Sequence, residues 1–375
     1  MTTQQGDSMM RQVQSSAQQT IPDGFERCFY TLWGHEGDSM IWETQPVEDI
    51  CDSILEGTGR QDWRKLRPFD MLPEVNPKGG DAELMLYVGE NLRVACQKVV
   101  GSQEHFLRAG DFQTIFFQFS GRSLVETSFG DYELEPGEAL LVPAMVAHRT
   151  TGSPNCQRMV YYPREFLYPS MQPEDETTDI RHTVHPQGQL PGEEVVPAVQ
   201  VPAQGKITER LTHWDALPGD DYIFMRSYEW VKGRGETGHR PHKVRPFNYY
   251  TTAPDDTSLK VRTSLLWEND TFRQRTYSNP GKQPGAHRGY DEDEFWFQFS
   301  GHLTQMTEHG KYLMEAGQTS MAEPGISHTS FNEPGGLRLT TYTNKPLRMV
   351  VDPSQHLRET SYEIKETIVK GWPGR

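Results

Sequence analysis

The sequence has little of what three large classes of protein need. Its four cysteines, Cys28, Cys51, Cys96 and Cys156, are scattered and include no Cys-x-x-Cys pair, which argues against a disulfide scaffold. No stretch approaches the roughly 20 consecutive apolar residues that span a bilayer. Basic residues are outnumbered, with 37 Lys and Arg against 52 Asp and Glu and a net charge of −15. That balance argues against nucleic acid or an anionic membrane as the partner.

The start of the chain and its cysteines together indicate a compartment. Residues 1–19 are polar and rich in Gln and Ser, and they lack the apolar core of a secretion signal. Scattered cysteines are typical of a reducing environment, so we expect reduced thiols and a cytoplasmic protein. The 375 residues suffice for one large domain or two ordinary ones, and the 15 Tyr, 17 Phe and 8 Trp are typical of a globular chain.

An internal repeat is the strongest evidence on architecture. Phe117-Gln118-Phe119-Ser120-Gly121 recurs as Phe297-Gln298-Phe299-Ser300-Gly301, with an offset in residue number of 297 − 117 = 180. The same offset relates Gly137 to Gly317 and His148 to His328. One offset that persists without a gap from Phe117 to His148 predicts two barrels of one kind.

The repeat and the composition divide the chain into four parts. We expect a flexible arm over residues 1–20, a first barrel over 21–165, a linker or surface excursion over 166–206 and a second barrel over 207–375. The linker is rich in Pro, Glu, Gln and Asp, which is typical of an exposed connection. We also expect a hairpin within residues 25–42, a helix within 47–66 and a short closing helix within 356–369.

Two histidines and one acid in the second copy have the spacing of metal ligands. His287, Glu294 and His328 lie on segments of strand-like composition, so they can meet on one side of a single ion. Two imidazoles and one carboxylate are the set expected for non-haem Fe(II) that keeps open positions for substrate and dioxygen. A structural zinc site would need a fourth ligand, usually a thiolate, and no cysteine is near. Among the neighbouring acids, Asp291 is the main rival to Glu294.

Strand geometry predicts which neighbours of Glu294 share its surroundings. Alternate residues of a strand face the same way, so an inward Glu294 places Trp296 and Gln298 inside the barrel as well. We expect these two side chains to line the cavity. The residues expected on the opposite face of the sheet are Phe295, Phe297 and Phe299.

The first copy lacks most of these candidate ligands. Subtracting 180 places Thr114 opposite Glu294 and Leu107 opposite His287. Only His148 keeps a ligating side chain. We interpret His148 as a buried, hydrogen-bonded residue rather than as part of a second metal site.

The site stretch resembles the paired cupin motifs. Those motifs read His-x-His, three or four residues, Glu, and then Gly, five residues, Pro-x-Gly, two residues, His, three residues, Asn. Gly289 stands where the motif has its second histidine, and Glu323 stands where it has proline. The resemblance implies an all-β bicupin fold, with two tandem double-stranded β-helix (jelly-roll) barrels and a few short helices. The matching residues are His287, Glu294, Gly317, Gly325, His328 and Asn332.

The second half of the chain is also similar to the iron-bearing half of homogentisate 1,2-dioxygenase and related hydroquinone dioxygenases. Thr271-Phe272-Arg273 and the segment from Gly238 to Lys243 carry this resemblance, with Gly289 where the family has asparagine. It implies Fe(II) as the cofactor and His239 as an acid/base group, with His242 as the alternative. We consider Arg288 and His302 as contacts for a substrate carboxylate, or else as solvated surface residues.

These features favour an Fe(II)-dependent, extradiol-type dioxygenase that cleaves a hydroquinone-like or homogentisate-like aromatic ring with O2. We expect a small aromatic substrate, no nucleic-acid or membrane partner, and a homo-oligomer. A second interpretation is a cupin isomerase or lyase that uses Mn(II), Zn(II) or Ni(II) as a Lewis acid. A third is a non-catalytic bicupin that serves as a binding protein. Iron-dependent oxygen uptake, anaerobic turnover and absence of bound metal would separate the three.

Overall fold

The structure is a computed structural model that describes residues 25–31, 41–46, 65–76, 79–169, 204–216, 224–231, 239–247, 262–278, 281–282, 286–289, 291–307, 310–326, 328–332 and 336–351. Strands dominate these residues. Two short 3-10 helices, η3 (Pro68–Met71) and η4 (Trp214–Ala216), interrupt them. Within the described ranges, no helix is long and apolar enough to cross a membrane.

The first barrel is built from two facing groups of antiparallel strands. One group runs β4-β5-β12-β7-β10, and the other contains β6, β11, β8 and β9. The strand β11 pairs with β5 and joins the two groups. The strands are β4 (Gly80–Gly89), β5 (Leu92–Ser102), β6 (Phe106–Ala109), β7 (Thr114–Ser120), β8 (Ser123–Thr127), β9 (Gly130–Leu134), β10 (Ala139–Val142), β11 (His148–Gly152) and β12 (Gln157–Pro163).

The second barrel repeats this plan with sheets β17-β18-β26-β21-β24 and β20-β25-β22-β23. Four of its strands, β20, β24, β25 and β26, have the same lengths as β6, β10, β11 and β12 and lie at the offset of the sequence repeat from them. The predicted all-β bicupin fold is therefore confirmed. The strands are β17 (Arg262–Glu268), β18 (Phe272–Ser278), β20 (Ala286–Gly289), β21 (Asp293–Ser300), β22 (His302–Thr307), β23 (Gly310–Glu315), β24 (Thr319–Ala322), β25 (His328–Asn332) and β26 (Leu337–Thr343), with the short β19 (Gly281–Lys282) beside β25.

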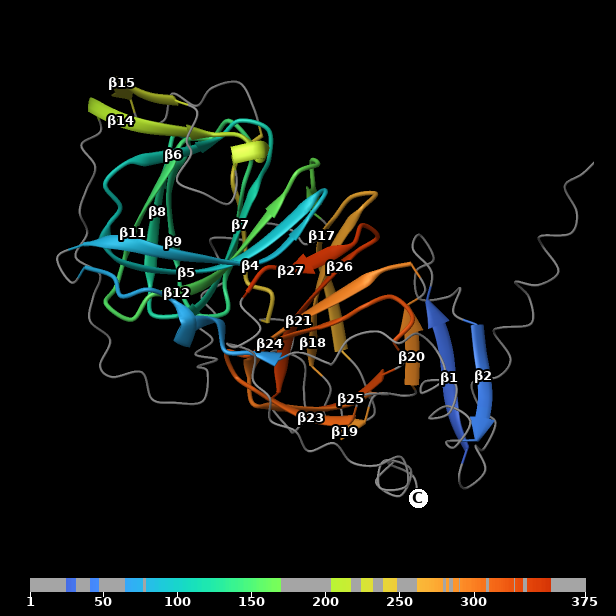
Figure 1. Cartoon of the computed structure of the whole chain (residues 1–375). Coiled ribbons are helices and arrows are strands. Elements are labelled where there is room, and N and C mark those ends of the chain that lie inside the picture. Colours follow the sequence, from blue (N-terminus) through green and yellow to red (C-terminus); the bar gives the residue numbers. More distant parts are fainter. Residues whose placement is uncertain are drawn as a thin grey trace, which may run out of the picture.

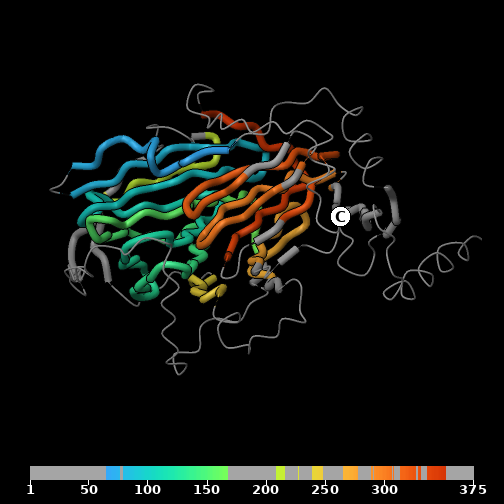
Figure 2. The backbone as a smooth tube through the Cα atoms, turned by 90° about the horizontal axis from the view of Figure 1, so that it is seen from below, coloured from blue at the N-terminus to red at the C-terminus, as the bar shows by residue number. Residues whose placement is uncertain are grey.

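The main hydrophobic core lies between the two barrels. Phe117 and Phe119 of β7 meet Phe297 and Phe299 of β21 there, with ring centroids 5.4 to 6.3 Å apart. Figure 2 shows the strands of the two barrels lying side by side along this contact. All eight residues of β21 are buried, because one face contacts this core and the other faces the interior of the second barrel. The buried interior cluster of the second barrel contains Trp296, Leu303, Met314, Ala322 and Ile326.

The predicted strand phase around Glu294 is confirmed by this division. Trp296 belongs to the cluster inside the second barrel. The three phenylalanines of the same strand belong to the core between the barrels. Because side chains alternate along a strand, Glu294 and Gln298 share the inner face with Trp296.

Strands that precede each barrel in the sequence pair with the other barrel. The hairpin of β1 (Phe25–Thr31) and β2 (Ile41–Pro46) adds to β20, and that of β14 (Gln204–Thr212) and β15 (Phe224–Val231) adds to β6. Figure 1 shows these hairpins at opposite ends of the molecule. The expected hairpin within residues 25–42 is confirmed. Two shorter strands that precede a barrel do the same: β3 (Lys65–Leu66) pairs with β24 and β16 (His242–Val244) with β10. Two others follow a barrel and pair with the other one: β13 (Tyr168–Pro169) with β17 and β27 (Leu347–Met349) with β4.

A short motif explains how β3 and β16 come to occupy equivalent places. Lys65-Leu66-Arg67-Pro68-Phe69 and Lys243-Val244-Arg245-Pro246-Phe247 are nearly the same sequence, at an offset in residue number of 243 − 65 = 178. Phe69 stacks on Phe119 and Phe247 stacks on Phe299, with ring centroids 4.9 and 5.0 Å apart. Each copy therefore joins one barrel's edge to the core between the barrels.

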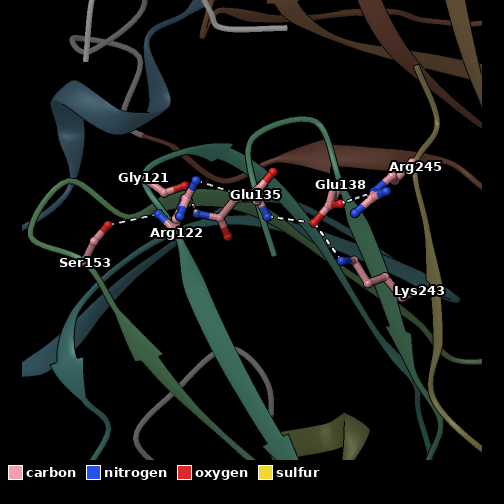
Figure 3. Close-up of polar contacts among 8 residues, drawn as sticks. Gly121, Arg122, Glu135, Glu138, Ser153, Lys243 and Arg245 are labelled. Atoms are coloured by element: carbon pink, nitrogen blue, oxygen red, sulfur yellow. Dashed lines mark hydrogen bonds and ion pairs between the residues drawn. The ribbon is translucent and has the colours of Figure 1, made fainter. Parts of the chain in front are cut away.

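Charges fix the second copy of this motif to the first barrel. Lys243 Nζ lies 2.9 Å from Glu138 Oε2, and Arg245 Nε donates to Glu138 Oε1 at 2.5 Å (Figure 3). Glu138 is buried, so both contacts are shielded from solvent. At the first copy, Arg67 contacts Glu315 at 2.6 Å in a more exposed pair.

Of the two predicted helices, one is partly contradicted by the structure and the other lies outside the described residues. Residues 65 and 66, the end of the helix expected within 47–66, form a strand because they pair with β24, so that part of the prediction is wrong. Residues 47–64 and the closing helix expected within 356–369 lie outside the described residues. Of the four cysteines, Cys96 and Cys156 form no disulfide, as expected, and both are buried. Cys51 and the side chain of Cys28 also lie outside.

Candidate metal centre in the second barrel

Glu294 and His328 meet inside the second barrel. Glu294 comes from β21 and His328 from the first position of β25, and the two residues are 5% and 2% exposed. His328 Nε2 lies 3.2 Å from Glu294 Oε2. The acid and the later histidine that the sequence spacing singled out are therefore in direct contact.

The tautomer of His328 decides what this contact means. Its Nδ1 lies 3.1 Å from the carbonyl oxygen of Ile326, which can only accept a hydrogen bond, so Nδ1 carries a proton. In the neutral ring Nε2 then presents a lone pair to the carboxylate. Either a proton or a metal ion between the two atoms would make this contact favourable. Ligand atoms that are each about 2.1 Å from an ion, at right angles, lie about 3.0 Å apart, so this geometry fits a metal.

Trp296 fixes the orientation of both groups. Its Nε1–H donates to Glu294 Oε1 at 2.5 Å, which leaves Oε2 for the side of His328. Its ring also lies edge-on to the His328 ring, with centroids 4.9 Å apart. Trp296 is fully buried, so this arrangement is held by packing. The sequence predicts Trp296 as a cavity residue, and the structure makes it a partner of Glu294.

The described backbone places His287 opposite His328. The Cα atoms of the two residues are partners in the antiparallel pairing of β20 with β25. Arg288 follows in β20 and pairs with Tyr30 of β1. The side chains of His287 and Arg288 lie outside the described part of the structure. Among the described side chains, no group of three or more His, Cys, Asp or Glu is arranged so that it could hold a metal ion.

The other acids near Glu294 have different surroundings. Asp291 is exposed, and Asp293 Oδ2 accepts a hydrogen bond from the backbone N–H of Leu347 at 2.6 Å. Glu292 packs beside Gly289, where an added Cβ would lie 2.8 Å from Glu292 Cγ. The glycine that replaces the motif's second histidine therefore makes room for Glu292. Geometry favours Glu294 over its rival Asp291.

Gln298 and His302 are less suited to contact a substrate. Gln298 Nε2 donates to the backbone carbonyl of Ser300 at 2.7 Å, the same bond that Gln118 makes to Ser120 in the first barrel. This amide shapes the turn after the strand. In β22, Leu303 and Gln305 are fully buried on the inner face. Alternation therefore puts His302 on the outer face, and its predicted contact with a substrate is not supported by this placement.

His239 and His242 lie against the first barrel. The strand β16 pairs with β10, so Leu141 is the Cα partner of His242. His239 is exposed and its ring lies 4.3 Å from that of Phe166, whereas the His242 ring lies 5.9 Å from Trp267. Their role in proton transfer stays a prediction.

Sequence reasoning missed a polar group on the inner face of β18 and β26. The hydroxyls of Tyr277 and Tyr342 lie 2.7 Å apart, and Arg338 Cζ lies 4.8 Å from the centre of the Tyr277 ring. Desolvation, and after it the charge of Glu294, raises the pKa of Tyr342 well above its ordinary value. Desolvation also raises the pKa of Tyr277, despite the nearby charge of Arg275. Strand alternation from Phe272 could have revealed this inner face.

The first barrel repeats the framework without the acid. His148 Nδ1 lies 3.2 Å from the Val146 carbonyl, and its ring lies 5.5 Å from that of Phe116, which takes the place of Trp296. Its Cα partner in β6 is Leu107, as His287 is the partner of His328. Burial lowers the pKa of His148 to about 4. His148 is thus a buried, hydrogen-bonded residue, as expected.

Comparison with known protein families finds no matching family model. No curated protein matches either. Among solved structures, the chain is similar to a cupin 2 conserved barrel domain protein from Leptotrichia buccalis, with 7% identity, TM-score 0.47, and coverage of 76% of this chain and 98% of that one. It is also similar to a mutant of Bacillus subtilis oxalate decarboxylase, with 11% identity, TM-score 0.44, and coverage of 78% and 80%. A third is the protein Ylba from E. coli, with 8% identity, TM-score 0.43, and coverage of 79% and 98%.

Proposed function

We propose that the second barrel binds Fe(II) through His287, Glu294 and His328, and that the protein is a dioxygenase that cleaves the ring of a hydroxylated aromatic compound. The contact between His328 Nε2 and Glu294 Oε2 carries the proposal, because the two buried atoms lie 3.2 Å apart, a spacing that suits two ligands of one metal ion. Bound Fe(II) would supply open positions for substrate and dioxygen and a path for electrons between them.

The register of β20 supports His287 as the third ligand. Residues that are direct partners in an antiparallel pair share one face of the sheet, and His287 is the partner of His328. The set is then two imidazoles and one carboxylate, which leaves positions open on iron. Neither described cysteine is placed to be a metal ligand in the second barrel. Cys96 donates to the Pro68 carbonyl, and Cys156 packs near Gln118 in the first barrel.

The chain's own residues orient the site and supply hydrogen bonds. Trp296 holds one oxygen of Glu294, which leaves the other for the ion. The raised pKa values of Tyr277 and Tyr342 keep both hydroxyls protonated near neutral pH, so the pair can donate to an oxygen of the substrate. Both tyrosines are partly exposed, which makes them accessible to a small molecule.

The experiment is anaerobic reconstitution with Fe(II) followed by an oxygen-uptake assay with hydroxylated aromatic compounds. We expect uptake that depends on iron and is lost in Glu294→Gln, a variant that keeps the size of the side chain. Turnover without oxygen, supported by Mn(II), Zn(II) or Ni(II), would instead identify an isomerase or lyase. Failure of the reconstituted protein to retain any transition metal would identify a binding protein.

A further inference from the structure

Each barrel contains one buried arginine at an equivalent position. Arg158 of β12 and Arg338 of β26 are related by the repeat, since 338 − 158 = 180, and each is 1% exposed. Arg158 Nη2 donates to Thr150 Oγ1 at 2.9 Å, and Arg338 Nη1 donates to Ser330 Oγ at 2.9 Å. Thr150 and Ser330 are themselves equivalent, so both arginines reach the facing sheet in the same way.

The two arginines differ in what accepts their remaining hydrogen bonds. In the first barrel, Arg158 donates from Nε and Nη2 to Gln97 Oε1, at 2.8 and 2.6 Å. The residue equivalent to Gln97 is Tyr277, because 277 − 97 = 180. Its hydroxyl contacts Tyr342 instead, and its ring lies under the guanidinium. Arg338 Nε therefore has no hydrogen-bond partner among the described residues.

A buried guanidinium N–H without an acceptor is unfavourable. We therefore expect a molecule from outside the chain to supply an acceptor at the Nε edge of the Arg338 guanidinium. The planar edge of a guanidinium matches the two oxygens of a carboxylate. Arg338 also shares the inner face of the second barrel with Glu294, because Arg338 is the Cα partner of Gln298 and Gln298 lies on the same face of β21 as Glu294. A molecule that reaches the tyrosine pair would meet Arg338 and the metal ligands together.

We propose that Arg338 binds a carboxylate of the substrate, so that the substrates are hydroxylated aromatic acids rather than neutral phenols or quinols. This rests on the proposed function only in placing the substrate inside the second barrel. Arg338 takes the role that the sequence suggested for Arg288 or His302. In the first barrel, Gln97 covers the Nε and Nη2 edge of the equivalent arginine, and only Nη1 of Arg158 lacks a partner among the described residues, so the edge that would fit a carboxylate is not available there.

The test is calorimetric titration of the full-length protein, after anaerobic reconstitution with Fe(II), with 3-hydroxybenzoate and with phenol. The parent protein should bind the acid more tightly. Arg338→Gln should weaken binding of the acid by about tenfold or more, the loss typical of a charged hydrogen bond, and leave phenol binding unchanged. The matched control Arg158→Gln, in the first barrel, should change neither affinity.

Tyr277→Gln provides a second variant if Arg338→Gln does not fold. It places the acceptor of the first barrel beside Arg338 and should also weaken binding of the acid. Equal affinity of the parent for both probes, or an acid preference that survives in Arg338→Gln, would overturn the proposal. Iron-dependent oxygen uptake without acid preference would contradict only this proposal. Acid preference in a protein that binds no iron would contradict only the proposed metal centre.

Discussion

Gly317 of the second barrel lies against the ring of Phe119 of the first. An added Cβ at Gly317 would be 2.9 Å from Phe119 Cζ, and one at the equivalent Gly137 would be 3.1 Å from Phe299 Cζ. Both glycines have positive φ angles, +83° and +86°, that other residues rarely adopt. The repeated phenylalanines and glycines of the sequence are thus the reciprocal contact between the barrels.

Gly317→Ala should destabilise the protein by about 1–3 kcal/mol, because it adds a methyl group against a packed ring and strains the backbone. Chemical denaturation measures the loss. Gly325→Ala is the matched control, since its φ is +86° and nothing lies within 4 Å of an added Cβ. The stability of Gly325→Ala should fall only by the smaller amount that comes from backbone strain. Equal losses in the two variants would contradict the packing explanation.

Trp296→Phe should weaken Fe(II) binding while leaving the fold intact. The substitution removes the N–H that holds Glu294 Oε1, and loss of such a supporting bond typically weakens metal affinity by about 10–100-fold. Phenylalanine fits this place in the first barrel, where Phe116 lies against His148. Anaerobic competition with a chelator gives the affinity. An unchanged affinity would show that Trp296 does not orient the ligand.

Glu138→Gln should lower stability by about 2 kcal/mol, because Glu138 is buried and accepts from both Lys243 and Arg245. Arg67→Ala should change it by less than about 0.5 kcal/mol, since Arg67 and Glu315 keep 42% and 45% of their side-chain surface exposed. Urea denaturation of both variants tests the difference. A larger loss of stability in Arg67→Ala than in Glu138→Gln would contradict the view that the buried contacts of Glu138 hold β16 more strongly than the exposed pair holds β3.

Stability should fall as the pH drops from about 6.5 to 4, in part because of His148. Burial, with Arg158 and Arg108 nearby, lowers the pKa of this ring to about 4. The unfolded chain takes up a proton at His148 below its ordinary value of 6.5, whereas the folded chain does not, so acid favours unfolding by up to about 3 kcal/mol. His148→Gln should lose less stability than the parent over this range. Identical pH profiles would contradict this assignment.

The repeat made the architecture predictable, because a single constant offset aligns strands, turns and the histidines His148 and His328. Alternation along β21 likewise predicted that Glu294 and Trp296 share the inner face. The placement of His302 could not be predicted in this way, because the turn at Gly301, with φ +63°, begins a new strand with its own phase. Phase cannot be carried across such a turn from the sequence alone.

Two features were harder to predict from the sequence. One is the pairing of β3 and β16 with the other barrel, and the other is the contact of Arg338 with Tyr277. The motif at residues 65–69 and 243–247 recurs at an offset two positions shorter than that of the main repeat, which therefore does not contain it. Arg338 and Tyr277 show no ligand-like spacing. The role proposed for Arg338 depends on which residues contact it, and on comparison with the contact between Arg158 and Gln97. Both contacts are known only from the folded structure.

The most direct test of the central claim is the iron content of purified protein after anaerobic reconstitution, compared between the parent, His328→Ala and His148→Ala. The two histidines occupy equivalent positions, and each donates from Nδ1 to the carbonyl two residues earlier. We predict stoichiometric iron in the parent and in His148→Ala, and its loss in His328→Ala. Retention of iron by His328→Ala, or loss in His148→Ala alone, would contradict the assignment of the metal centre to the second barrel.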